Sequence, residues 1–247
     1  FEKGEVALFT LSAVNLGALD SLDELEDITE IIVRSLDSLL DYQDYPLKSA
    51  EITSNNRRTL GIGVTNLAYY LAKNDAKYSD GSGNDLIHKT FEALQYYSLK
   101  ASNKLAEEFG PCPLFSETQY ANGIMPIDSY KKDIDVFCTT KLELDWDTLR
   151  KDIQSKGLRN STLTALMPCE SSSQISNSTN GIEPPRGFVS VKQSKDGILK
   201  QVVPEYEKLH KKYELLWDIK DNEGYLQLCA IMQKFVDQSI STNTHYD

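Results

Sequence analysis

The residues best suited to chemistry form the segment Met-Pro-Cys-Glu-Ser-Ser-Ser-Gln at positions 167–174. The apolar run at 161–167 predicts a strand that Pro168 ends, and the hydroxyl-rich residues 169–179 begin a predicted helix. The first turn of a helix presents unpaired N–H groups and the positive end of the helix dipole, and serine hydroxyls add donors. The segment is therefore suited to binding phosphate at the carboxyl end of a parallel strand, where α/β folds bind ligands.

A second interpretation gives this segment a structural role only. Serine is a common capping residue, so Ser171, Ser172 and Ser173 could simply cap and solvate the start of the helix. On the residues alone, the two interpretations weigh about equally. The stiff loop Glu183-Pro184-Pro185-Arg186-Gly187 could likewise position Glu183 or Arg186 in a site. For that loop the favoured interpretation is a rigid crossover with an Arg–Glu pair.

Metal, redox-pair and triad chemistry find no support. The four cysteines are scattered, with no CxxC pair and no histidine at ligand spacing: Cys112, Cys138, Cys169 and Cys229. We expect them to be buried small hydrophobic side chains in a reducing cytosol. The three histidines lie far apart, the first two on predicted polar helix faces: His88, His210 and His245.

Two further patterns have a structural interpretation. The adjacent tyrosines at 69–70 and 96–97 fall on predicted helices, with a spacing typical of core packing. Gly61 and Gly63 lack the third glycine of a dinucleotide-binding fingerprint and predict close backbone packing instead.

The elements that must position these residues are typical of one α/β domain spanning 1–247. The run at 5–13 predicts a strand buried on both faces of a parallel sheet. Residues 21–41 predict an amphipathic helix with Ser21 and Glu24 as a capping box. The other predicted elements are a helix in the later part of 57–73, helices at 84–109 (ended by Gly110) and 146–155 (ended by Gly157), a loop at 112–130, a strand at 188–191, and helices at 205–217 and 225–240.

Composition excludes several classes of protein. The chain has 247 residues, 40% of them hydrophobic and 26% charged, which excludes a disordered tail, a collagen-like fibre and a disulfide-stapled miniprotein. The net charge of −11 argues against duplex binding as the main function. No apolar run approaches 18 residues and no signal peptide opens the chain. We expect both ends, Phe1 and Asp247, to be interruptions of a longer polypeptide.

Three segments resemble a known family: RRTLGIGVTNLAYYLAK at 57–73, GLRNSTLTALMPCESSSQISNSTNGIEPPRG at 157–187, and GYLQLCAIMQKFVDQSISTNTHYD at 224–247. They resemble the large, catalytic subunit of aerobic class I ribonucleoside-diphosphate reductase, in particular its enterobacterial and T-even-like phage branch. The resemblance covers all 247 residues. It implies radical-based reduction of ribonucleoside diphosphates in a ten-stranded α/β barrel, of which this chain would be the second half.

The resemblance also implies a substrate site. The loop that would hold the substrate diphosphate contains Pro168, Cys169, Glu170, Ser171 and Ser172. Most relatives have serine where this chain has Cys169. Because a thiol is a weaker donor than a hydroxyl, the main-chain N–H groups would contribute more of the binding.

The chain departs from the family where the redox chemistry is expected. One of the two reducing cysteines should lie in a string of the form ALCTLS, and the third residue of that string is here Phe9. Phenylalanine can neither donate a hydrogen atom nor form a disulfide. The thiyl-forming cysteine with its asparagine and glutamate would precede this chain, and the paired tyrosines and shuttle cysteines would follow Asp247.

Two hypotheses follow. In the first, the chain is part of a reductase and inactive alone, with these partners: the missing N-terminal half, a separate di-metal small subunit that generates the radical, and an external dithiol reductant. No cofactor or metal would bind to this chain itself, nor would nucleic acid or a membrane, and it would be cytoplasmic. In the alternative, the chain is a catalytically inactive remnant that binds a nucleotide diphosphate or partner subunits only.

Overall fold

A layer of parallel extended segments forms the centre of the molecule. The computed structural model describes residues 4–195 and 197–244, and in it β1 (Thr10–Asn15) pairs in parallel with β2 (Leu60–Thr65). Two more extended segments, near residues 162–166 and 238–241, continue this parallel layer through the bridges Ile62–Thr164 and Leu166–Ile240. Because the four segments join in chain order with helices in every connection, the described residues form a mixed helix–strand fold of the α/β type.

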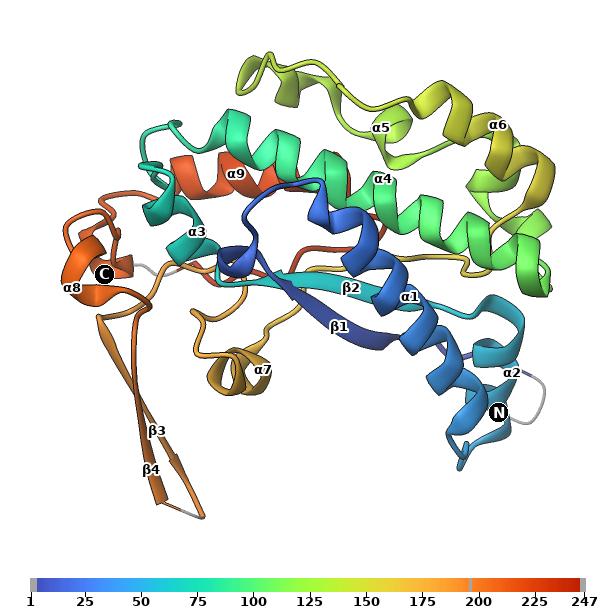
Figure 1. Cartoon of the computed structure of the whole chain (residues 1–247), viewed down its shortest axis with the longest axis horizontal. Coiled ribbons are helices and arrows are strands. Elements are labelled where there is room, and N and C mark those ends of the chain that lie inside the picture. Colours follow the sequence, from blue (N-terminus) through green and yellow to red (C-terminus); the bar gives the residue numbers. More distant parts are fainter. Residues whose placement is uncertain (1–3, 196, 245–247) are drawn as a thin grey trace.

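The long helices lie on one side of the parallel layer. In Figure 1, α1 (Glu24–Tyr42) and α4 (Asn84–Phe109) pack together above β1 and β2, and α9 (Glu223–Gln233) packs along α4. The remaining α-helices are α2 (Lys48–Arg57), α3 (Leu67–Lys73), α5 (Pro126–Ser129), α6 (Trp146–Lys156), α7 (Glu170–Ile175) and α8 (Tyr206–Leu209). Short 3₁₀ turns lie at Leu16–Ala18, Phe115–Glu117, Gln119–Asn122, Lys132–Val136 and Leu216–Asp218.

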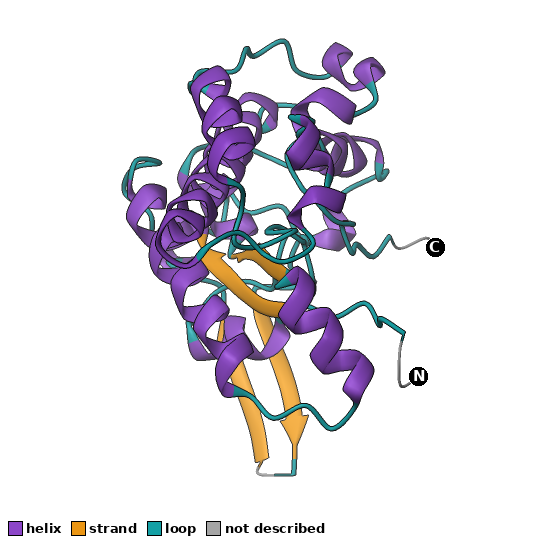
Figure 2. Ribbon diagram, turned by 90° about the vertical axis from the view of Figure 1, so that its right-hand side faces the viewer, coloured by secondary structure: helices purple, strands orange, loops and turns teal. Residues whose placement is uncertain are grey.

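The opposite side of the parallel layer is sparsely covered. It carries α7 and an antiparallel hairpin of β3 (Val189–Ser194) and β4 (Gly197–Val202), which extends away from the helices in both views (Figures 1 and 2). The predicted burial of the first strand on both faces is therefore wrong. Phe9 and Leu11 are 41% and 52% exposed on the uncovered face, and β1 begins at Thr10 rather than at residue 5.

Several predicted boundaries are confirmed. The helix at 84–109 has the predicted bounds, and Gly110 ends it with a φ of +83° and an N–H bond to the Ala106 carbonyl. Gly157 ends α6 in the same way. Glu24 accepts the N–H of Ser21 at 2.8 Å, as a capping box predicts, although α1 itself begins three residues after Ser21.

The largest errors lie in the last third of the chain. The predicted helix at 205–217 is reduced to α8 and a 3₁₀ turn, and α7 is shorter than the predicted helix at 169–179. The predicted helix at 225–240 corresponds to α9, which ends at Gln233 instead of Ile240. The chain then becomes the fourth segment of the parallel layer. The half-buried Asp237 accepts the N–H groups of Leu163 and Thr164 there. This contact spans more than 70 residues, so local periodicity could not reveal it.

His88 is also placed differently from the prediction. It lies in the core instead of on a polar helix face, with its ring edge-on to Phe235 and its Nε2 3.3 Å from Lys234 Nζ. Burial, together with the nearby charge of Lys234, lowers the pKa of His88 from 6.5 to about 4. His210 lies half-buried beside α8, and His245 lies outside the described residues.

We expect this buried histidine to make stability depend on pH. Between about pH 6.5 and pH 4 the unfolded chain binds a proton that the folded chain does not, so acidification across this window favours unfolding, by about 2–3 kcal/mol. Urea unfolding at pH 7 and pH 4.5 should show this loss in the parent chain and a smaller loss in His88→Gln. Equal losses in the two proteins would contradict the assignment.

Candidate functional site

The carboxyl ends of the parallel segments gather the polar residues of the candidate site. Asn15 ends β1, Asn66 follows β2, and Cys169 and Asn243 follow the third and fourth segments. Asn66 joins two of these ends, because its Nδ2 donates to Asn15 Oδ1 at 2.9 Å while its Oδ1 accepts the N–H of Thr179 at 3.0 Å. The residues therefore meet at the edge where ligands bind in α/β folds.

The predicted loop lies at this edge, and α7 starts directly after it. Cys169 precedes the helix, and its N–H donates to Asn180 Oδ1 at 2.9 Å. Among the described residues, no acceptor pairs with the N–H groups of Glu170, Ser171 and Ser172, which form the first turn of α7. These three N–H groups, and not that of Cys169, are available to an anion.

The hydroxyls of the three serines differ in availability. Ser172 Oγ donates to the Cys169 carbonyl at 3.2 Å and Ser173 Oγ to the Glu170 carbonyl at 2.9 Å, so both stabilise the turn. Ser171 is exposed, and its hydroxyl has no partner among the described residues. The structural interpretation is therefore confirmed for the hydroxyls of Ser172 and Ser173, and anion binding stays a prediction, with the Ser171 hydroxyl available for it.

The Cys169 thiol points into the molecule. It is buried and lies 3.3 Å from the Met167 carbonyl and 3.6 Å from that of Val64. Burial raises the pKa of this thiol above its usual value, so it stays protonated at neutral pH. Its contribution is to hold the loop, and Pro168, which is exposed, ends the preceding extended segment.

Hydrogen bonds from Thr65 and Asn66 to Thr179, here called the clamp, hold the segment after α7 in place. The Thr179 carbonyl accepts from Thr65 Oγ1 at 2.8 Å and from the N–H of Asn66 at 2.9 Å. Asn66 is buried and has a φ of +70°, a backbone conformation that asparagine tolerates better than most residues. Because Asn180 follows Thr179, the clamp also fixes the side chain that binds the Cys169 N–H.

Removal of the Asn66 side chain should therefore destabilise the protein. We expect Asn66→Ala to cost about 2–4 kcal/mol, through buried hydrogen-bonding groups left unpaired and through alanine in a left-handed conformation. Asn66→Gly removes the same bonds without the conformational strain and should cost less. Urea unfolding of both variants provides the measurement, and an equal loss would show that the left-handed backbone contributes nothing.

The proline-rich loop has a different role from the one favoured by sequence. Among the described residues Arg186 makes no ion pair with Glu183, so the expected Arg–Glu pair is not formed. Glu183 Oε1 instead accepts the N–H of Asn243 at 3.2 Å and its Nδ2 at 2.5 Å. Glu183 therefore lies at the candidate site and ties the loop to the end of the fourth segment.

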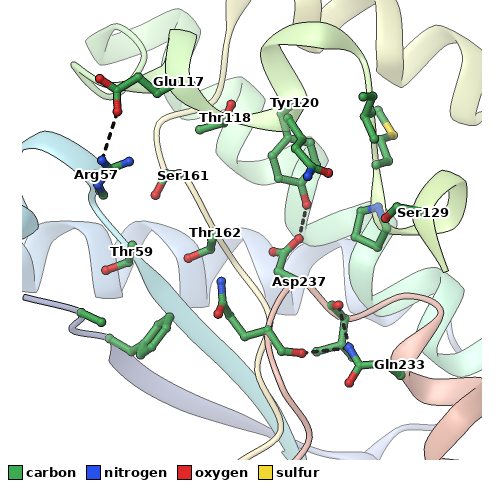
Figure 3. A pocket seen from close by; sticks show the side chains of 18 of the residues that line it. Arg57, Thr59, Glu117, Thr118, Tyr120, Ser129, Ser161, Thr162, Gln233 and Asp237 are labelled. Atoms are coloured by element: carbon green, nitrogen blue, oxygen red, sulfur yellow. Dashed lines mark hydrogen bonds and ion pairs between the residues drawn. The ribbon is translucent and has the colours of Figure 1, made fainter.

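The structure also contains a cavity that the sequence did not predict, with a volume of about 890 Å³. It lies at the amino ends of the parallel segments, opposite the predicted loop, and Arg57, Tyr120 and Asp237 are among its lining residues (Figure 3). Phe9 also lines it. Arg57 is paired there with Glu5 and Glu117, and Tyr120 donates to Asp237. No sequence signal indicated this cavity, because its walls come from five separated stretches of the chain.

The remaining predictions of structural roles are confirmed. All four cysteines are buried and free, and the four tyrosines at 69–70 and 96–97 pack in or against the core. Gly61 and Gly63 lie inside β2, where a Cβ atom would come within 2.5 Å of Leu11 and 2.7 Å of Met167 respectively. Close packing therefore explains both glycines.

The described residues contain neither a cluster suited to a metal ion nor a membrane-spanning helix. No group of three or more histidine, cysteine, aspartate or glutamate side chains is arranged to hold a metal ion there. Within the same residues, no helix is both long enough and apolar enough to span a membrane.

Comparison with known proteins gives a consistent result. A family model described as "Ribonucleotide reductase, barrel domain" matches residues 2–247. Ribonucleoside-diphosphate reductase subunit alpha of Haemophilus influenzae is 68% identical over 246 residues, which cover all of this chain and 32% of that protein. Subunit alpha of reductase 1 from Escherichia coli is 67% identical over 84% of this chain and 27% of its own length. The phage T4 subunit alpha is 52% identical over 98% of this chain and 32% of its own length. The chain thus spans about a third of the length of these curated relatives.

Proposed function

Because the chain belongs to the ribonucleotide reductase barrel-domain family, we propose that it supplies the substrate-diphosphate loop of a subunit that reduces ribonucleoside diphosphates. One observation carries this proposal. The N–H groups of Glu170, Ser171 and Ser172 and the Ser171 hydroxyl are unpaired at the carboxyl ends of the parallel segments. Such a group of donors suits a diphosphate, whose negative charge also interacts favourably with the start of a helix.

The rest of the substrate would extend along the uncovered face of the parallel layer. Phe9, Gly61 and Ala165 lie side by side on this face, since a Cβ on Gly61 would be 3.7 Å from that of Phe9 and 3.5 Å from that of Ala165. Ala165 precedes Cys169 by four residues, or about 13 Å in an extended chain. A nucleoside bound by its diphosphate at the loop would therefore point its sugar toward Phe9.

The remaining strands, the radical and the reducing equivalents would come from other parts of the proposed enzyme. We propose that further strands extend the parallel layer at its edges and close it into a ten-stranded barrel, with the uncovered face inside. The radical would come from a separate small subunit with a di-metal centre, and an external dithiol would provide the reducing equivalents. The residues of this chain bind and orient the diphosphate and shield it on one side.

A carboxylate at position 171 should weaken substrate binding. In a hybrid subunit in which this chain replaces the matching third of the Haemophilus influenzae relative, we expect Ser171→Asp to raise KM at least about tenfold, because like charges repel at close range. The substitution should not unfold the loop, since aspartate is favourable at a helix start. Steady-state kinetics with a ribonucleoside diphosphate and the relative's small subunit provides the measurement, with Phe9→Cys present in every hybrid so that the reducing thiol is restored.

The matched control is Ser155→Asp, which makes the same change at an exposed position on α6. It should leave KM unchanged. If Ser171→Asp and Ser155→Asp gave the same KM, the loop would not hold the diphosphate.

The alternative, an inactive remnant that binds nucleotide or partner subunits only, is motivated by Phe9. The three relatives are all named as reductase subunits, which favours the hypothesis that this chain is part of a catalytic subunit. Activity of Phe9→Cys in the hybrid subunit distinguishes the catalytic hypothesis from the inactive-remnant hypothesis.

A further inference from the structure

The β3–β4 hairpin is a projecting element with two different faces. Its strands pair in antiparallel register, with Val189 opposite Val202 and Val191 opposite Lys200. Side chains directly opposite each other share a face, and alternate residues point to opposite faces. One face, the inner face, therefore contains Ser190, Lys192, Leu199 and Gln201. The other, the outer face, contains Val189, Val191, Gln193, Ile198, Lys200 and Val202.

Contacts of the inner face and of the base hold the hairpin in position. Gln201 Nε2 donates to the carbonyls of Ser173 and Ser178 at 3.3 and 3.1 Å, and Lys192 Nζ lies 3.5 Å from Glu170. At the base, the N–H of Val203 donates to the Phe188 carbonyl at 2.9 Å. An isolated two-stranded hairpin is marginally stable in water, so these contacts are needed to keep it ordered. The hairpin is thus preorganised.

The outer face is apolar and open to solvent. Its four aliphatic side chains are between 45% and 65% exposed: Val189, Val191, Ile198 and Val202. Within the described residues neither strand pairs with a third, so each presents an unpaired edge. Exposed apolar patches and open strand edges typically mark sites of association with another polypeptide.

Charge indicates which kind of polypeptide fits. Residues 186–202 contain four basic residues and one acidic residue, whereas the whole chain has a net charge of −11. Lys200 lies among the aliphatic side chains of the outer face, and neither it nor Lys195 forms an ion pair with a described residue. A second copy would bring two faces that each carry Lys200 together, without acidic partners for them. An acidic segment would instead pair its carboxylates with these lysines.

We propose that the hairpin docks an extended, acidic segment of a partner protein, which adds as a third strand and covers the outer face with alternating apolar side chains. Main-chain hydrogen bonds to the open edge would provide affinity, and the valines, Ile198 and Lys200 would provide specificity. This inference is independent of the diphosphate loop.

A peptide probe tests the proposal on the hybrid subunit. The probe is a fluorescent eight-residue peptide of alternating valine and glutamate, and two controls replace glutamate by lysine or every second valine by proline. We expect saturable binding of the glutamate peptide only, measured by fluorescence anisotropy. Lys200→Glu should weaken it at least about tenfold, whereas Lys141→Glu, the same change at an exposed position remote from the hairpin in sequence, should not.

Three results would overturn the proposal. Equal binding of the glutamate and lysine peptides would show that charge plays no part. No binding to the hybrid subunit would show that the outer face does not accept a free strand. A dimer that Val191→Asp converts to a monomer would assign the face to a second copy. Circular dichroism of Val191→Asp and Lys200→Glu ensures that loss of binding is not loss of folding.

Discussion

Replacement of Phe9 by cysteine is expected to raise the turnover of the hybrid subunit by about 10²-fold or more. Reduction of a ribonucleotide by a dithiol pair requires both thiols, and a phenyl ring can supply neither a hydrogen atom nor a disulfide bond. The side chain at position 9 is 41% exposed on the uncovered face of the parallel layer, so a smaller cysteine fits without a clash. The measurement is multiple-turnover reduction of a ribonucleoside diphosphate with a dithiol reductant.

Leu11→Cys is the matched control for this substitution. Leu11 lies two residues after Phe9, within β1 and on the same uncovered face, and is 52% exposed. It should gain a reactive thiol but no activity, because the thiol would be about 7 Å displaced along the strand. If Phe9→Cys remained inactive while the relative's unmodified subunit was active, the inactive-remnant hypothesis would be favoured.

Removal of the Asp37 side chain is expected to destabilise the protein by about 3–5 kcal/mol, since the buried guanidinium of Arg58 loses its buried carboxylate partner and keeps only the exposed one of Asp41. Asp37 and Arg58 are almost completely buried, and Asp37 Oδ1 accepts from Arg58 Nε at 2.7 Å and from Asn160 Nδ2 at 3.0 Å. Its Oδ2 accepts from Arg159 at 3.1 Å. This carboxylate joins α1 to the residues before two segments of the parallel layer. Urea unfolding of Asp37→Ala at pH 7 tests the prediction.

Asp41 provides the control within the same cluster. It also pairs with Arg58, at 2.8 Å, and a hydrogen bond from Arg58 lowers the pKa of Asp41, but its side chain is 59% exposed. Because water screens exposed pairs, Asp41→Ala should cost only about 0–1 kcal/mol. Similar losses for Asp37→Ala and Asp41→Ala would show that burial does not determine the strength of this cluster.

Local pattern predicted the elements whose signals lie within a few residues. The long helix α4 has the predicted bounds because its apolar spacing and the glycine at its end are local signals. The same local reasoning failed after Gln233, where apolar spacing continued but the chain turned into an extended segment. There the deciding contact was between Asp237 and the N–H groups of Leu163 and Thr164, and no window of 15 residues contains both sides.

At the candidate site, too, the sequence predicted the position of the residues but not their individual contacts. The sequence placed Pro168, Cys169, Glu170, Ser171 and Ser172 after a strand and at a helix start, and it placed phenylalanine where the family resemblance requires a reducing cysteine. It could not assign separate roles to Ser171 and Ser172, because the roles depend on which hydroxyl reaches a carbonyl in the folded turn.

By itself, then, the sequence determined the family, the segment that we propose binds a diphosphate, and the presence of Phe9 where the resemblance implies a cysteine, since each is a property of residue type and order. Only the tertiary structure decided that Asn66 and Asn180 hold that segment, that His88 is buried, and that one face of the parallel layer and the outer face of the hairpin are open. The physical reason is that burial, hydrogen-bond partners and exposed faces depend on contacts between residues far apart in the chain, which form only when the parallel layer assembles.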